Sequence, residues 1–178
     1  KPQKGDFYLE GKRFTFSTKE RKLMARKVGY VFQDPDVQLF APSVYEDVAF
    51  GPSNLELEPK EIEERVKKYL QLLHIEELQY KAPHQLSYGQ KKQVAVAGVL
   101  AMEPDIILFD EPFAWLDNRH KKIMHGIIDD LQRKGKTVLI STHNPDFAFE
   151  WADQVVLMKQ GRIIAADTPE KIMTSKAL

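Results

Sequence analysis

Apolar runs alternate with amphipathic segments over the last third of the sequence. Apolar side chains dominate residues 105–109 and 137–141, as is typical of strands buried on both faces. Between these runs, residues 119–133 repeat apolar positions at helical spacing. A strand, a helix and a second strand in this order predict a parallel sheet covered by helices, so the expected fold class is α/β.

The pattern also predicts shorter elements on either side of this core. A hairpin is expected near the start, with strands at 7–9 and 14–16 around the turn Glu10-Gly11-Lys12. The other expected elements are a strand at 28–32, a helix at 146–151, strands at 155–158 and 162–165 joined by Gln160-Gly161, and a helix from Pro169. An N-terminal antiparallel part therefore accompanies a mostly parallel sheet.

The middle third has a different pattern. Pro59 opens a segment with acidic residues first, basic residues later and apolar residues at helical spacing, which predicts an amphipathic helix. A second helix is expected from Ser87 to Met102, where Pro104 stops it. We interpret residues 53–103 as a helical subdomain inserted into a single domain that spans residues 1–178.

Composition narrows the class of protein. Of 178 residues, 43% are hydrophobic and 29% are charged, which is typical of a globular protein. Basic and acidic residues number 26 each, which argues against a nucleic-acid partner. The lack of cysteine excludes disulfides, thiolate metal sites and cysteine nucleophiles. No signal peptide and no apolar run of about 20 residues is visible, so we expect a cytosolic location.

Two adjacent carboxylates follow the strand expected at 105–109. Ligands of open α/β sheets bind at the carboxyl ends of the strands. Asp110 can therefore hold Mg²⁺, and Glu111 can orient or deprotonate a water molecule. The alternative is an ordinary strand followed by a solvated acidic turn.

A second candidate site is Leu86-Ser87-Tyr88-Gly89-Gln90, directly before a helix. Ser87 suits the N-cap, and a helix N-terminus with a hydroxyl and a glycine can also bind a phosphate. Gln33 and His143 each follow a strand-like run, and Asp117 precedes a helix. Taken singly, these three have simpler explanations as a solvated glutamine, a packed or surface histidine and a helix cap.

Together, these groups resemble the nucleotide-binding domain of ABC transporters over essentially the whole chain. The matching residues are Gln33 for the Q-loop, 86–90 for the signature motif, Asp110 for the Walker B aspartate, Glu111 for the catalytic glutamate, Asp117 for the D-loop and His143 for the switch histidine. The resemblance implies a P-loop NTPase-like fold in which the helical subdomain carries the signature motif.

Residues 31–40 and 46–52 resemble the cobalt/nickel and energy-coupling-factor (ECF) subgroup, which powers uptake of metal ions and vitamins. Three positions depart from the wider family pattern. Tyr88 stands where glycine is commonest, and Trp115 stands where the residue is usually small. Gln93 stands where a basic residue is common, so we expect a phosphate-side or packing contact to differ there.

The Walker A sequence G-x-x-x-x-G-K-[ST] is not found in the 178 residues. Gly135-Lys136-Thr137 has the right last three residues, but Asp130 stands at the first glycine position, and the run precedes a strand rather than a helix. By resemblance, the first residue falls just after the Walker A helix. We therefore expect the complete subunit to be an ATPase, and residues 1–178 alone to be inactive and to fold poorly.

The resemblance implies ATP and Mg²⁺ as ligands. The implied site residues are Gln33, Ser87, Gly89, Gln90 and Asp117 for nucleotide, Gln33 and Asp110 for Mg²⁺, and Glu111 and His143 for catalysis. The implied partners are a second ATPase subunit, identical or different, that closes head to tail over ATP, a transmembrane coupling protein and a substrate-binding membrane component. The subunit would then lie at the cytoplasmic face of the cell membrane as a peripheral protein.

Other interpretations remain open. A non-transport ABC ATPase acting on nucleic acid or ribosomes is disfavoured by the neutral charge and by residues 34–52. A non-hydrolysing adaptor would explain the missing Walker A sequence but has no need of Asp110, Glu111 and His143. Large apolar residues after Gln33 either line a groove for a coupling helix or fill the core of the helical subdomain. They are Val37, Leu39, Phe40, Val44, Tyr45, Val48 and Phe50.

Overall fold

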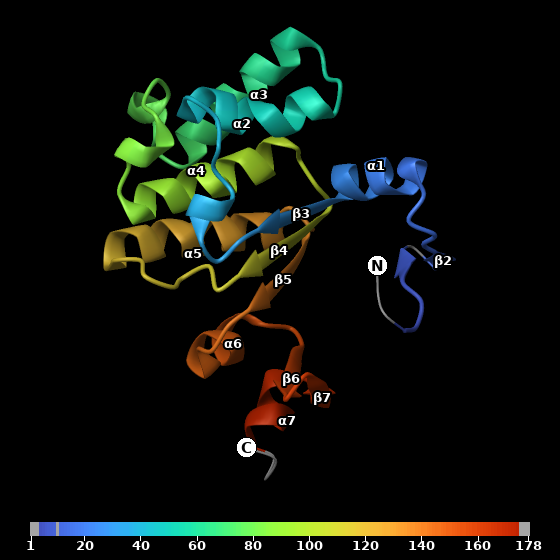
Figure 1. The fold of residues 1–178 in the computed structure, drawn as a ribbon. Coiled ribbons are helices and arrows are strands. Elements are labelled where there is room, and N and C mark those ends of the chain that lie inside the picture. Colours follow the sequence, from blue (N-terminus) through green and yellow to red (C-terminus); the bar gives the residue numbers. More distant parts are fainter. Residues whose placement is uncertain (1–3, 10, 175–178) are drawn as a thin grey trace. The chain divides into compact units, whose positions relative to one another are not determined.

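The computed structural model describes residues 4–9 and 11–174, which form two compact units (Figure 1). The first unit ends at Ser141, and the second begins at Thr142. The first contains a parallel sheet, a group of packed helices and a short hairpin, and the second contains an antiparallel pair and two short helices. The expected α/β fold class is confirmed.

The parallel sheet consists of β3 (Val28–Val31), β4 (Ile106–Asp110) and β5 (Thr137–Ser141), with β4 in the middle. Val31 lies opposite Phe109, and Asp110 lies opposite Ser141. The sequence predicted all three strands to within one residue of their observed bounds. Because parallel strands in this register end at nearly the same level, the residues that follow them meet at one edge of the sheet.

Within the described residues of the first unit, helices cover one face of this sheet. Ile107 and Phe109 are buried, their neighbours along β4 are half-buried, and Leu139 of β5 is 58% exposed. Our expectation that β4 and β5 are buried on both faces is therefore wrong. Helix α4 (Tyr88–Ala101) packs against β3, and α5 (Asn118–Arg133) packs against β5, so the buried side chains face these helices.

The helices of the middle third pack on one another. They are α2 (Val44–Asn54), α3 (Pro59–Leu72) and α4, accompanied by the short 3-10 helices η1 (Pro35–Val37), η2 (Glu76–Leu78) and η3 (Pro83–Gln85). The predicted helices from Pro59 and from Ser87 are confirmed as α3 and α4. Most of α4 is buried, because it lies between α2, α3 and β3. The subdomain bounds 53–103 stay a prediction.

Two helices were not predicted. Helix α1 (Thr18–Lys27) begins at the N-cap Ser17 and has no buried side chain, so it lacks the apolar periodicity by which helices are recognised. Helix α2 contains Gly51 and Pro52, which normally argue against a helix interior. The N-cap of α2 is Ser43, whose hydroxyl accepts from the backbone N–H of Glu46 at 3.3 Å, a start signal that was overlooked.

The predicted hairpin is present with shifted bounds. β1 (Tyr8–Leu9) pairs with β2 (Lys12–Arg13), so the second strand begins inside the expected turn and not at residue 14. Glu10 of that turn lies outside the described residues. In the second unit, α6 (Pro145–Trp151), the antiparallel pair β6 (Val155–Lys159) and β7 (Arg162–Asp167), and α7 (Pro169–Thr174) confirm the elements predicted there.

Candidate functional site

Asp110 is held at the end of β4 by a side chain from each neighbouring strand. Its carboxylate accepts hydrogen bonds from the Ser141 hydroxyl on β5 and, at 3.2 Å, from the Tyr30 hydroxyl on β3. Burial raises the pKa of the Tyr30 hydroxyl, and the nearby Asp110 carboxylate raises it further. The carboxylate is therefore fixed at the edge of the sheet where a ligand is expected.

Glu111 follows Asp110 in an uncommon backbone conformation. Its φ of +42° lies in the left-handed region, which costs a residue other than glycine about 1–3 kcal/mol. The Glu111 N–H donates to the Ser141 carbonyl at 3.1 Å, which ties the turn to β5. Both carboxylates are half-buried. Strained backbone of this kind concentrates at functional sites, in agreement with the interpretation of Asp110 and Glu111 as a site.

The segment after β3 is fastened to α4. The Gln33 carbonyl accepts from the Tyr88 hydroxyl and from the Lys92 ammonium, both at 2.9 Å, and the Phe32 carbonyl accepts from Lys92 at 2.7 Å. Lys92 is completely buried, and burial lowers the pKa of Lys92 to about 8 against the opposing attraction of Asp110, Asp34 and Glu111. The Gln33 side chain itself is exposed.

Ser87 caps α4, so the simpler explanation of this residue is confirmed. The Ser87 hydroxyl accepts from the Gln90 N–H at 3.3 Å, and the Gln90 side chain accepts from the Ser87 N–H at 3.0 Å, a reciprocal capping box. A hydroxyl that accepts a hydrogen bond keeps its own proton for donation. The cap therefore leaves the phosphate-binding role of Ser87 chemically open, and that role stays a prediction.

Gly89 and Asp117 are linked through His120, a residue not predicted from the sequence. A Cβ atom at Gly89 would lie 2.7 Å from ring atoms of His120, so this position has room only for glycine unless the ring moves. The His120 ring lies 2.8 Å from the Asp117 carboxylate, which also accepts from the His120 N–H and has a lowered pKa as a result. The expected signature and D-loop residues thus meet across one imidazole ring.

Three further residues noted in the sequence, His143, Trp115 and Gln93, differ from one another in exposure and contacts. His143 is exposed, follows β5 and belongs to the second unit, so its expected role stays a prediction. Trp115 has a φ of +62° and is 81% exposed. The buried Gln93 donates its side-chain N–H to the Leu73 carbonyl at 2.8 Å and so makes a packing contact between α4 and the end of α3.

The oxygen donors at the sheet edge suit Mg²⁺, which keeps several water or phosphate ligands, better than a metal ion that is coordinated by protein side chains alone. The described residues contain no group of three or more His, Asp or Glu side chains placed to hold a metal ion. Mg²⁺ usually binds through one or two carboxylates together with water and substrate phosphates. Asp110 ends β4, and Gln33 lies just beyond the end of β3, so each places an oxygen donor of the required kind near this edge.

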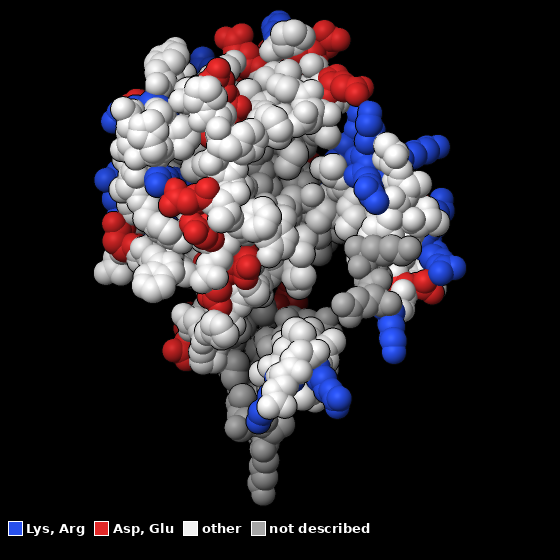
Figure 2. Space-filling view, viewed as in Figure 1, with Lys and Arg blue, Asp and Glu red and all other residues white. Residues whose placement is uncertain are grey.

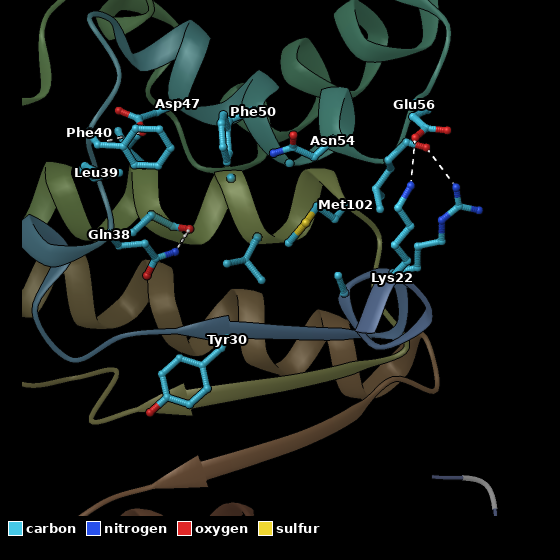
Figure 3. A pocket seen from close by; sticks show the side chains of 18 residues that line it. Lys22, Tyr30, Gln38, Leu39, Phe40, Asp47, Phe50, Asn54, Glu56 and Met102 are labelled. Carbon is cyan, nitrogen blue, oxygen red and sulfur yellow. Dashed lines mark hydrogen bonds and ion pairs between the residues drawn. The ribbon is translucent and has the colours of Figure 1, made fainter. Parts of the chain in front are cut away.

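A separate apolar pocket of about 330 Å³ opens between α1, α2, α4 and residues 38–40 (Figure 3). Phe40 packs edge to face on Phe50 there, and both rings are substantially exposed, at 66% and 48%. Of the apolar residues predicted to line a groove, Val44 and Val48 are instead completely buried core residues. The core explanation is therefore confirmed for Val44 and Val48, whereas docking of a coupling helix on the exposed residues stays a prediction.

Basic side chains gather beside this pocket. Lysine and arginine predominate on α1, whereas the two signs are mixed over the rest of the face shown in Figure 2. Lys22 of α1 pairs with Glu56 at 3.4 Å, and Arg26 donates to the Leu55 carbonyl at 3.2 Å. The pocket thus has an apolar floor and a charged edge.

Four residues around the site were not predicted from the sequence: Tyr30, Lys92, His120 and Ser141. Ser141 and Tyr30 were detectable in principle, because the in-register pairing of predicted parallel strands places them beside Asp110. Lys92 reads as one more charged residue in a helix, and only the packing of α4 shows that its ammonium is buried.

Comparison with known proteins agrees with this geometry. Residues 1–114 match the model of the family described as ABC transporter. The chain is 42% identical over all 178 residues to the energy-coupling factor transporter ATP-binding protein EcfA2 of Methanospirillum hungatei, and 52% identical over 153 residues, 86% of the chain, to EcfA of Carboxydothermus hydrogenoformans. It spans 45% and 56% of the length of these two relatives.

Solved structures give the same result. CbiO1 from Clostridium perfringens, part of an ABC transporter complex, superimposes with a TM-score of 0.83 at 41% identity, over 99% of this chain and 70% of the other. A dimeric ATP-binding cassette with bound ADP and Pi gives a TM-score of 0.83 at 26% identity, over 95% of this chain and 75% of the other. By sequence and by fold, the chain belongs to the ABC transporter family.

Proposed function

We propose that the protein containing this chain is the ATP-hydrolysing subunit of an ECF-type or cobalt-type importer for metal ions or vitamins. The observation that carries the proposal is the convergence around Lys92. Its ammonium donates to the Gln33 carbonyl and is attracted by both Asp110 and Glu111. Lys92 also belongs to α4, the helix that Ser87 caps and that contains the signature residues 88–90. The names of the similar ATP-binding proteins support the choice of importer class.

In this proposal each group has one role. Ser87, Gly89 and Gln90 present the N-terminus of α4 to the γ-phosphate of ATP bound mainly by a second subunit. Glu111 orients and deprotonates the attacking water, and His143 contacts the γ-phosphate. Asp117 belongs to the subunit interface, where the His120 ring keeps it next to the signature helix.

Asp110 and Gln33 would hold Mg²⁺ at the sheet edge. When held there, the ion would supply positive charge to offset the negative charge on the phosphate oxygens. Ser141 and Tyr30 fix the Asp110 carboxylate from both sides, so it needs no rearrangement to accept the ion. Because no segment of residues 1–178 matches the Walker A phosphate cradle, we propose that these residues alone do not hydrolyse ATP.

The pocket beside α1 is the proposed docking site of a transmembrane coupling protein. No helix in residues 4–9 and 11–174 has the length and apolar character needed to span a membrane. We infer a peripheral position at the cytoplasmic face of the membrane, with a second ATPase subunit and a substrate-binding membrane component as further partners. A short helix from the coupling protein would lay its apolar side on Phe40 and Phe50.

Replacing Glu111 by glutamine tests the catalytic part of the proposal. In the full-length protein, Glu111→Gln should keep ATP binding and slow hydrolysis by about 10²-fold or more, the scale on which a general base contributes. Turnover is measured as phosphate release and binding as equilibrium retention of labelled ATP. Unchanged turnover would remove Glu111 from the catalytic role, and absence of ATPase activity in the unmodified protein would overturn the proposed function.

A further inference from the structure

Two side chains on one face of α4 reach the same piece of main chain. Tyr88 and Lys92 are four residues apart, and such residues lie one above the other on a helix. Tyr88 donates to the Gln33 carbonyl at 2.9 Å, and Lys92 donates to the carbonyls of Phe32 and Gln33 at 2.7 and 2.9 Å. Both contacts cross more than 50 residues of sequence.

Burial of the Lys92 ammonium group carries a large desolvation free energy. Lys92 has no exposed surface, and removing an ammonium group from water costs several kcal/mol unless strong acceptors replace the water. Its two main-chain acceptors are neutral. A buried ion seldom adds net stability compared with an apolar residue of the same size, but it does hold its acceptors in one arrangement.

The same segment is attached to α4 at further points. Lys91 forms an ion pair with Asp36 at 2.6 Å. The Gln38 side chain donates to the Ala95 carbonyl at 3.2 Å (Figure 3) and accepts from the Phe32 N–H at 3.0 Å. Residues 32–38 are thus fastened along two turns of α4, from Tyr88 to Ala95.

We propose that Lys92 is a positioning residue that fixes Gln33 relative to the signature residues at the start of α4. Gln33 and the N-terminus of α4 then move as one body, and displacement of either displaces the other. This inference rests on the proposed ATPase function, because Gln33 and residues 87–90 are assigned to nucleotide and Mg²⁺ there. Lys92 itself touches only main chain and takes no part in the reaction.

Hydrogen exchange tests the attachment without reference to activity. In full-length protein, Lys92→Met removes the donors while keeping the length of the side chain. The amides of Phe32, Asp36 and Gln38 should then exchange at least about tenfold faster, the size of effect expected when a hydrogen bond to a charged group is lost. Amides within α3 should keep their rates. Unchanged exchange at 32–38 in the folded variant would overturn the proposal.

Enzyme kinetics test the link to Gln33. We expect Gln33→Ala and Lys92→Met each to lower kcat/KM for Mg·ATP by about tenfold, and the double variant to be no slower than the slower single variant. Lys92→Gln, which retains N–H donors, should recover much of the loss. Lys68→Met is a matched control, because Lys68 pairs with Glu103 on the surface of α3 and contacts none of these groups.

Each outcome decides a separate point. If the losses in kcat/KM of the two single variants multiply in the double variant, Lys92 does not act through Gln33, and the proposal is overturned. If Lys92→Met does not fold, Tyr88→Phe replaces it, because that change removes one hydroxyl from a half-buried ring and should loosen the same amides. If the unmodified protein hydrolyses no ATP, the proposed function fails, and hydrogen exchange still accepts or rejects the attachment.

Discussion

The buried Lys92 should give the protein an unusual dependence of stability on pH. Its pKa falls from 10.5 to about 8 on folding, because burial disfavours the ammonium form. Between pH 8 and 10.5 the unfolded state therefore binds more protons than the folded state, so the free energy of unfolding rises with pH through this window. A pKa shift of this size changes the free energy of unfolding by about 3 kcal/mol once Lys92 is deprotonated in both states.

Lys92→Met isolates this contribution. The variant lacks the titrating group, so the unfolding free energy of the unmodified protein minus that of the variant should rise by about 3 kcal/mol between pH 7.5 and 10.5. Urea unfolding of the full-length protein, without nucleotide or divalent cations, measures both values. Tyr30 and Tyr69 have raised pKa values and destabilise the protein at high pH, but this effect is common to both proteins and cancels in the difference.

Lys68 provides a control of opposite sign. The hydrogen bond to Glu103 raises the pKa of Lys68, so its contribution to stability is present at low pH and is lost as the pH rises through the raised value. The corresponding difference for Lys68→Met should therefore fall with pH. A flat difference for Lys92→Met from pH 7.5 to 10.5 would refute the argument, because it would mean that the Lys92 amine is not desolvated in the folded state.

Further predictions concern the start of α4 and the pocket beside α1. Gly89→Ala should lower ATPase activity and melting temperature because the new Cβ meets the His120 ring, and adding His120→Ala should recover part of the melting temperature in calorimetry. Ser87→Ala should cost about 1 kcal/mol in denaturant unfolding through loss of the cap, and an activity loss beyond that of a stability-matched variant would support phosphate contact. Phe40→Asp and Phe50→Asp should abolish co-purification with the membrane partner while the ATPase rate of the isolated subunit stays within about twofold, and loss of folding would instead assign these rings to the core.

How far the sequence predicted the structure depended on burial. The strands β3 and β4 and the helix α3 bury apolar side chains in a regular pattern, so their existence and bounds followed from that pattern. Helix α4 is buried on most of its surface, and its bounds followed from Ser87 and Pro104 instead. Helix α1 has no fully buried side chain, and its polar sequence shows no periodic signal. The exposure of Leu139 was not predicted for a different reason. An apolar run in a sequence looks the same whether one face of the strand is covered or both.

The candidate site was predicted as a set of residues but not as an arrangement. The order of Gln33, residues 86–90 and Asp110 pointed to the family, and the strand register then placed Asp110 between Tyr30 and Ser141. Contacts that cross between elements left no trace in the local pattern. His120 lies three residues after Asp117, yet its importance comes from Gly89, which belongs to a different helix.

In the contacts of Lys92 and Gln93, only the donor position requires a particular kind of side chain. Both side chains are buried, and both donate to main-chain carbonyls, those of residues 32, 33 and 73. Every amino acid offers the same carbonyl, so substitutions at the accepting positions leave these hydrogen bonds possible. These hydrogen bonds therefore place no constraint on the side chains of the accepting residues, and Gln33 is constrained only by its own proposed role in the site. Methods that infer contacts from paired substitutions would then overlook the attachment of residues 32–33 to α4.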